Sequence, residues 1–200
     1  MNNNPAEDQT VFALVNYAPP PLADWLLSLR RSLPVAPSSQ PHLTVLPPRP
    51  LAIPLREAQE KLTAILSPWR SFEVEVSGVR VFPGSNMLYL EVDDGSSTLR
   101  QLHAELNSGE FAHQECFEYH PHVTIGGPVA PECLEAMSAK AVEAWQSSPC
   151  PRRFLIEELA FVSISAADRQ QDWQRLWTYR LTGNGTYSAA ARASISSQTF

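Results

Sequence analysis

The segment Pro41-His42-Leu43-Thr44-Val45-Leu46-Pro47-Pro48 recurs 80 residues later as Pro121-His122-Val123-Thr124-Ile125-Gly126-Gly127-Pro128. The two copies share the first proline, the histidine, the threonine and the last proline, with mostly conservative apolar exchanges between them. Each copy has the length of one strand and lies between two stretches of helical periodicity. Because two copies are too few for a solenoid, the pattern predicts a duplicated strand within one domain.

Within each copy the histidine and the threonine are two positions apart. Successive side chains of a strand point to opposite faces, so His42 and Thr44 share one face while their apolar neighbours anchor the other face in the core. The same holds for His122 and Thr124. If the two halves pack about a pseudo-twofold axis, two imidazoles and two hydroxyls face one groove.

The remaining hydrophobic pattern changes between helical and strand periods. It predicts helices around 22–33, 55–66, 99–106 and 134–145, and strands around 10–17, 72–81, 86–92, 154–165 and 173–181, with a bulge or bend at Gly78. The order βαβαββ followed by αβαββ indicates an α+β fold with two similar halves, centred on 42–45 and 122–125.

Length and charge limit both the domain count and the partners. The chain has 200 residues, is 44% hydrophobic and carries a formal net charge of −6 at pH 7. We assign one domain to residues 10–181, a flexible N-terminus to 1–9 and a disordered tail to 183–200. Binding to long nucleic acids grows with the number of Lys and Arg contacts, so we expect a small nucleotide or a single RNA terminus as the substrate.

The cysteines are Cys116, Cys133 and Cys150, an odd number without C-x-x-C spacing. This usage favours neither a disulfide framework nor a cysteine-based metal site. The first residues show no signal-peptide pattern, and no apolar stretch is long enough to span a bilayer. We therefore expect a cytoplasmic monomer with reduced thiols and no membrane contact.

Two imidazoles and two hydroxyls in one groove suit the chemistry of a phosphodiester. One neutral histidine can take a proton from water, and the other, as imidazolium, can protonate the leaving oxygen. The threonine hydroxyls can donate hydrogen bonds to the non-bridging oxygens. This scheme requires no metal or other cofactor.

The paired H-x-T-x strands resemble the 2H phosphoesterase superfamily, and most closely its bacterial RNA 2',3'-cyclic phosphodiesterases, also called 2'-5' RNA ligases. The resemblance covers roughly residues 10–181. It extends to the order of elements from Val81-Phe82 through Pro83-Gly84 to 87–90, and to the helix that precedes 117–122. A single H-x-T-x is common by chance, whereas two copies in matching contexts are specific.

The resemblance implies a bilobal α+β fold, with two pseudo-symmetric lobes that each hold an antiparallel-rich sheet and two helices around a central active-site groove. It also implies metal-independent opening of cyclic phosphates and, in some members, ATP-independent 2'-5' joining of RNA ends. By motif, His42 and His122 are the acid and base in an unassigned order, and Thr44 and Thr124 bind phosphate.

One position departs from the family pattern. Members of this branch often have a basic residue shortly after the second motif, where this chain has Gly126-Gly127. Arg49, which follows the first motif, is therefore a candidate for a substrate-binding cation. The alternative is a solvated charge in a loop, a common role for arginine.

Other interpretations remain open from the sequence. Cys116, His120 and His122 could bind a metal, although the spacing is not that of a typical zinc site, and we expect His113 and His120 to be surface residues. His103 lies on the apolar stripe of its helix, so we expect a hydrogen-bonded histidine at the edge of the core. Trp173, Trp177 and Tyr179 could stack on nucleobases, but a stripe at strand spacing is more often core. The alternative functions are a non-catalytic nucleotide or RNA-end binding module and a 2'-5' RNA ligase.

Overall fold

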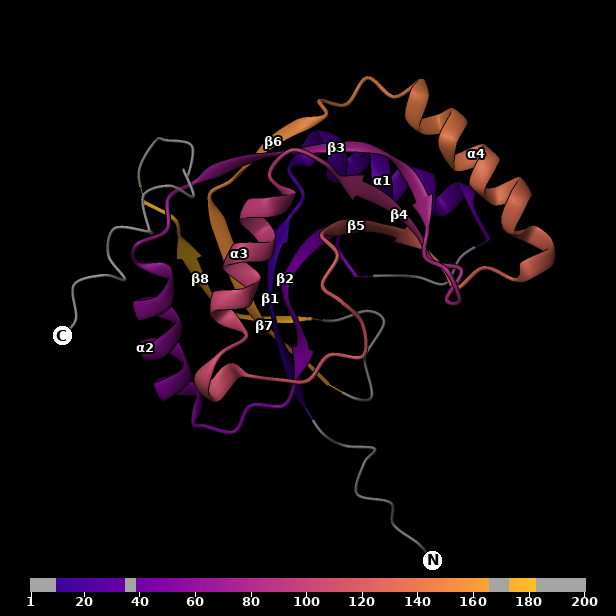
Figure 1. Ribbon diagram of the computed structural model, residues 1–200. Coiled ribbons are helices and arrows are strands. Elements are labelled where there is room, and N and C mark those ends of the chain that lie inside the picture. The colour runs from indigo at the N-terminus through magenta and orange to yellow at the C-terminus, as the bar shows by residue number, and fades with distance from the viewer. Residues whose placement is uncertain (1–9, 35–38, 166–172, 183–200) are drawn as a thin grey trace, which may run out of the picture.

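The computed structural model describes residues 10–34, 39–165 and 173–182, and it has the predicted α+β architecture (Figure 1). The predicted flexible N-terminus and tail lie outside these ranges. The strands are β1 (Val11–Tyr17), β2 (His42–Arg49), β3 (Phe72–Val81), β4 (Leu88–Val92), β5 (His122–Gly126), β6 (Arg153–Ile156), β7 (Glu158–Ile164) and β8 (Gln174–Arg180). The α-helices are α1 (Pro20–Ser32), α2 (Leu55–Leu66), α3 (Ser96–Leu106) and α4 (Leu134–Gln146), and short 3-10 turns cover Gly109–Phe111 and Pro131–Cys133.

The eight strands form one curled sheet in the order β6-β3-β4-β5-β2-β1-β7-β8, and every neighbouring pair is antiparallel. The two strands that carry the repeated motif, β2 and β5, are the central neighbours. The predicted irregularity at Gly78 is confirmed, because the β3–β4 register shifts between Val76 and Val79.

The two halves of the sheet exchange strands, which differs from two lobes built on separate sheets. β3 and β4 come from the first half of the chain but pair with β6 and β5 of the second half, whereas β7 comes from the second half and pairs with β1. The single strand predicted over 154–165 is in fact two, because Glu157 interrupts it. β6 pairs with β3, and β7 pairs with β1 and β8. Each half of the sheet therefore depends on chain from the other half.

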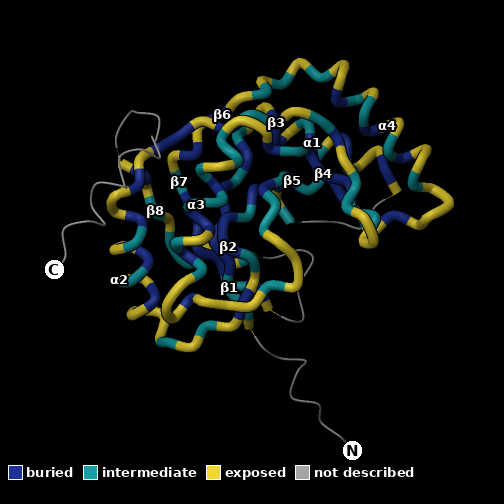
Figure 2. Tube along the Cα trace, in the orientation of Figure 1, coloured by how far each residue is buried: buried dark blue, intermediate teal, exposed yellow. Residues whose placement is uncertain are grey.

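The four helices named above cover one face of the sheet. α2 packs against α3 over β2, and α4 and α1 lie over β3 and β5 (Figure 1). The apolar residues of the motif, such as Leu43 and Val123, are fully buried in the cluster that contains the inward faces of these helices. Figure 2 shows buried strands between helices whose outer faces are exposed.

The opposite face of the sheet, called the inner face below, carries a smaller apolar cluster. It consists of buried residues from β1 and β7, packed against the side chains of Tyr17 and Trp173; the buried members are Ala13, Val15, Ala160, Val162 and Ile164. Since side chains alternate along a strand, the histidines and threonines of the motif also face this side. Among the described residues, no helix combines the length and the apolar composition needed to span a bilayer.

Candidate active site

The site is centred on the point where β2 and β5 pair, at Leu43 opposite Val123. Antiparallel register then sets His42 opposite Thr124 and Thr44 opposite His122, on the inner face. All four side chains are half-buried, and residues 41–50 and 121–130 show the same succession of buried, half-buried and exposed positions. The structure thus brings the four predicted site residues together, with the two histidines in diagonal positions on either side of the Leu43–Val123 pair.

Each histidine is held by a carbonyl two residues before it. His42 Nδ1 lies 2.7 Å from the Gln40 carbonyl oxygen, and His122 Nδ1 lies 2.6 Å from the His120 carbonyl oxygen. A carbonyl only accepts, so Nδ1 carries the proton and donates it in both rings. The neutral imidazole then has its lone pair on Nε2, which is the atom left for acid–base chemistry.

β2 and β5 separate beyond the Leu43–Val123 pair, and side chains from the helices fill their empty hydrogen-bonding positions. On β5, Arg30 of α1 donates to the carbonyl oxygens of Thr124 (2.6 Å) and Ile125 (2.9 Å). Arg30 also donates to the Ser39 carbonyl at 2.7 Å, three residues before His42. One guanidinium therefore ties the backbones of both histidine segments to the same helix.

The equivalent carbonyls on β2 have equivalent partners. The Tyr119 hydroxyl donates to Thr44 O at 2.8 Å, and His103 Nδ1 lies 2.9 Å from Val45 O. His103 is buried and stacks on Tyr119, with ring centroids 4.0 Å apart, which confirms the prediction of a satisfied histidine at the edge of the core. The pseudo-twofold relation therefore extends from the motif to its supporting hydrogen bonds.

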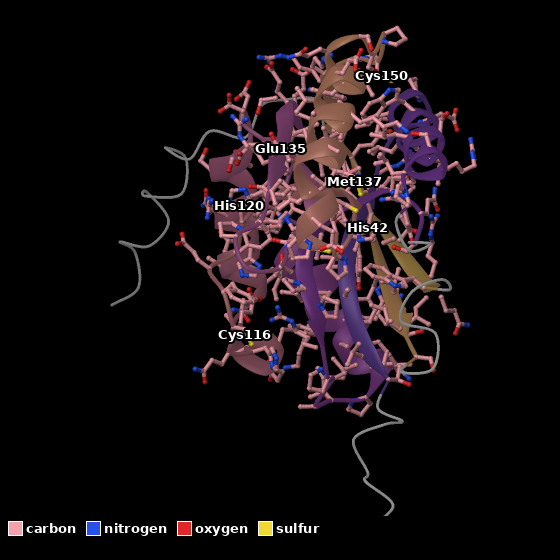
Figure 3. The ribbon with its side chains drawn as sticks, turned by 90° about the vertical axis from the view of Figure 1, so that its right-hand side faces the viewer. His42, Cys116, His120, Glu135, Met137 and Cys150 are labelled. Carbon is pink, nitrogen blue, oxygen red and sulfur yellow. The ribbon has the colours of Figure 1, made fainter. Side chains whose placement is uncertain are left out.

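The two histidines have different surroundings. His42, labelled in Figure 3, lies opposite Tyr17. Its ring centroid is 4.4 Å from that of Trp173. His122 lies opposite Glu91 and contacts two aromatic rings edge-on, those of Phe82 and Tyr89; the centroid distances are 4.8 Å and 5.5 Å. The site is thus chemically asymmetric although its backbone is nearly symmetric.

Charge and burial change the pKa values of both rings. Burial lowers the pKa of His42 from 6.5 to about 4; the hydrogen bond to the Gln40 carbonyl opposes this change, and the charges of Arg30 and His122 add to it. Burial also lowers the pKa of His122, and the charge of His120 adds to this change; the hydrogen bond to the His120 carbonyl and the Glu91 carboxylate act in the opposite direction and favour the imidazolium. Both rings are held in the neutral form in the free protein at pH 7, His42 more strongly.

The predicted stripe of Trp173, Trp177 and Tyr179 is divided by a bulge. Phe161 pairs with Trp177 and the next residue, Val162, pairs with Arg175, so Leu176 is the extra residue of β8. Trp177 and Tyr179 consequently pack into the helix-side core, as predicted, whereas Trp173 and Arg175 reach the inner face beside His42.

Arg49 does not reach the site as a free cation. It ends β2, is only 3% exposed, and donates to Asn107 Oδ1 (2.5 Å), the Phe111 carbonyl (2.8 Å) and Glu115 Oε1 (2.5 Å). A guanidinium with these partners holds residues 107–115 against β2. Arg49 is therefore a structural residue and not part of the candidate site. The alternative interpretation, an arginine solvated in a loop, is also wrong because Arg49 is buried.

The residues considered for a metal site are dispersed. Cys116 is exposed, and the described part of the chain contains no group of three or more His, Cys, Asp or Glu side chains arranged for a metal ion. The expectation that His120 is a plain surface residue is wrong: it is half-buried, and its Nε2 lies 2.9 Å from Glu91 Oε1, next to His122 (Figure 3). His113, predicted at the surface, is exposed.

Several residues of the site were missed from the sequence. No sequence motif includes Glu91, Tyr17 or Arg30. Strand register places Glu91 and Tyr17 opposite the two histidines, and the packing of α1 places Arg30 against β5. The alternation of β4 could have indicated that Glu91 faces the same side as a neighbouring histidine, but only once β4 was known to pair with β5.

A protein-family model matches most of this chain. The model of the 2'-5' RNA ligase superfamily matches residues 18–168. The chain belongs to this superfamily. The matched range contains both H-x-T-x strands and the helices that support them, in agreement with the resemblance to 2H phosphoesterases.

Related sequences carry phosphoesterase names. A protein of Geobacillus kaustophilus (strain HTA426), provisionally named a phosphoesterase, is 27% identical over 124 residues, which are 58% of this superfamily member and 68% of the relative. A similarly named protein of Geobacillus thermodenitrificans (strain NG80-2) is 36% identical over 73 residues, or 36% of this chain and 42% of the relative.

Solved structures show the same fold at low sequence identity. LigT of E. coli, crystallised with 3'-AMP, has a TM-score of 0.62 at 17% identity, covering 88% of this chain and 100% of LigT. The protein TT0787 of Thermus thermophilus has a TM-score of 0.52 at 15% identity, covering 88% of this chain and 100% of that protein. At such identities the likeness concerns the fold alone.

Proposed function

We propose that this protein is a metal-independent phosphodiesterase that opens 2',3'-cyclic or related phosphates of nucleotides or RNA ends by two-histidine acid–base catalysis. The observation that carries the proposal is the register of β2 and β5, which sets two histidines and two threonines on one face around Leu43–Val123. LigT, a structural neighbour, has been crystallised with 3'-AMP, a nucleoside monophosphate of the class expected as product.

The proposed reaction begins with the cyclic phosphate between the two imidazole rings. The threonine hydroxyls donate to its non-bridging oxygens, whose charge is redistributed in the transition state. One histidine takes a proton from water as the water oxygen bonds to phosphorus. The other gives a proton to the ribose oxygen as its bond to phosphorus breaks, so the product is a phosphomonoester and the two rings have exchanged protonation states.

We infer the roles of the two histidines from their neighbours. Arg30 disfavours a proton on His42, so His42 is the base that accepts a proton from water. Glu91 favours a proton on His122, against the charge of the neighbouring His120, whereas no carboxylate among the described residues acts on His42; His122 is therefore the acid that protonates the leaving oxygen. Because both rings are neutral in the free protein, the negative phosphate supplies the remaining stabilisation of the imidazolium on binding.

The test is turnover of a substrate panel with product identification. The panel comprises the four nucleoside 2',3'-cyclic phosphates, an oligoribonucleotide with a cyclic phosphate end and ADP-ribose cyclic phosphate, and phosphorus NMR reports the position of the product phosphate. We expect hydrolysis that is unaffected by EDTA. Tight binding without product at any pH would replace this proposal with the non-catalytic binding module, and 2'-5' joined RNA as the main product would replace it with the ligase.

A further inference from the structure

Arg175 is an exposed guanidinium on the inner face, brought there by the bulge in β8. Its Cζ lies 4.6 Å from the centre of the Tyr17 ring, over which it stacks. No ion pair joins Arg175 to an acid among the described residues, whereas Arg180 on the same strand pairs with Glu158 at 3.0 Å. Arg175 is therefore positioned by an aromatic ring and not neutralised by a described carboxylate.

Stacking leaves the donors of Arg175 available. A guanidinium is planar, so contact through its face with Tyr17 leaves the in-plane N–H groups directed outward, where they can bind a phosphate in a bidentate manner. Tyr17 pairs with His42 across β1 and β2, and the two ring centroids are 6.4 Å apart. The cation thus lies one aromatic ring away from the reacting centre.

The charges around the groove favour one direction for an anionic substrate. The His122 side carries Glu91, whose carboxylate contacts His120 at 2.9 Å and Arg80 at 3.5 Å. The His42 side carries Arg175. Gly127, which lies on the His122 side after the second motif, is strained for any side chain, because its φ of +131° favours glycine and a Cβ there would lie at a tight 3.0 Å from the Asn86 carbonyl oxygen.

We propose that Arg175, stacked on Tyr17, binds a second phosphate of the substrate: the 5'-phosphate of the terminal nucleotide whose 2',3'-cyclic phosphate lies between the histidines. This inference rests on the proposed function and extends it to specificity. The nucleoside lies on the His42 side of the groove, and the site selects an RNA terminus over a nucleoside cyclic phosphate that lacks a 5'-phosphate.

The test compares adenosine 2',3'-cyclic phosphate with and without a 5'-phosphate, for the unmodified protein and for Arg175→Ala. The unmodified protein is expected to have a KM about tenfold lower for the 5'-phosphorylated substrate, the typical effect of one solvent-exposed charge-assisted contact. Arg175→Ala should abolish this preference while changing the KM for the other substrate less than about twofold. Salt should weaken the preference only in the unmodified protein.

The matched control is Arg180→Ala, an exposed arginine of β8 that pairs with Glu158, which should keep the preference. An equal loss on both substrates in Arg175→Ala, or no preference in the unmodified protein, would overturn the proposal. If no substrate is turned over, the proposed function fails, and the subsite is judged by calorimetric binding of adenosine 3',5'-bisphosphate against adenosine 3'-phosphate. Tighter binding of the bisphosphate that is lost in Arg175→Ala supports the subsite, and equal affinities refute it.

Discussion

Glu91→Gln tests the roles of the two histidines, because it removes a charge opposite His122 while keeping the size of the side chain. Glu91 raises the pKa of His122, whereas burial lowers it. Removing the carboxylate should therefore lower the pKa of His122 further. The Nδ1 bond to the His120 carbonyl and the position of the ring should persist.

The size of the expected effect on His122 follows from the distance between the Glu91 carboxylate and the His122 ring. At about 6 Å and an effective dielectric constant of about 20, a pair of unit charges interacts by about 3 kcal/mol, or about 2 pKa units. The Glu91 side chain is 27% exposed and is shared with Arg80 and His120, which screens the interaction. We expect the pKa of His122 to fall in Glu91→Gln, with about half of the unscreened interaction remaining to favour the imidazolium in the unmodified protein.

The assay is the pH dependence of kcat on a nucleoside 2',3'-cyclic phosphate. If His122 is the acid, the alkaline limb of the bell moves down by about one unit, and kcat on that limb falls by about tenfold. Glu60→Gln, which removes an exposed carboxylate that pairs with Arg56 on α2, is the control and should leave the profile unchanged. A shift of the acid limb alone would exchange the two roles, and an unmoved profile would refute the electrostatic reasoning.

The remaining predictions concern stability. Arg30→Ala leaves three carbonyls near the motif without their donor, so urea unfolding should show a loss of about 2–4 kcal/mol; a loss below about 0.5 kcal/mol would mean that water replaces the guanidinium. The pKa of His42 is about 4 when folded and 6.5 when unfolded, so its stabilising contribution is complete above pH 6.5 and is lost as the pH falls towards 4, by up to about 3 kcal/mol. The difference in unfolding free energy between pH 7 and pH 4.5 should be smaller in His42→Asn; an equal difference would contradict the depressed pKa. Leu43→Ala should cost about 2–5 kcal/mol by opening a cavity under the motif, measured by thermal unfolding, and a loss under about 1 kcal/mol would show that the site collapses around it.

Local periodicity was enough to predict much of the fold. The apolar repeats in α1 and α4, the alternation in β3 and the irregularity at Gly78 are properties of a few neighbouring residues, and the structure confirms them. The common face of His42 and Thr44 also follows from alternation alone. These features depend on the pleat and on the helical period, which the sequence displays directly.

Tertiary pairing explains what could not be predicted. Glu157-Glu158 interrupts the apolar run over 154–165, but two charges alone do not show that a second strand begins there or that β7 pairs with β1. The bulge at Leu176 separates Trp173 from Trp177; the change from Gln174-Arg175 to Leu176-Trp177 interrupts the alternation there, but only the pairing with β7 shows that Leu176 is the extra residue. Arg49 looked like a loop cation because its acceptors, Asn107 and Glu115, lie about 60 residues away in sequence.

The most direct measurement of the central claim is kcat for His42→Ala, His122→Ala and the double variant on a nucleoside 2',3'-cyclic phosphate that the unmodified protein opens. Each single variant is expected to lose about two to four decades of rate, the usual contribution of general acid or base catalysis. The double variant should lose little more than the worse single variant, because the two rings act on one phosphate as a unit. Unchanged activity in either single variant would contradict catalysis by the paired histidines.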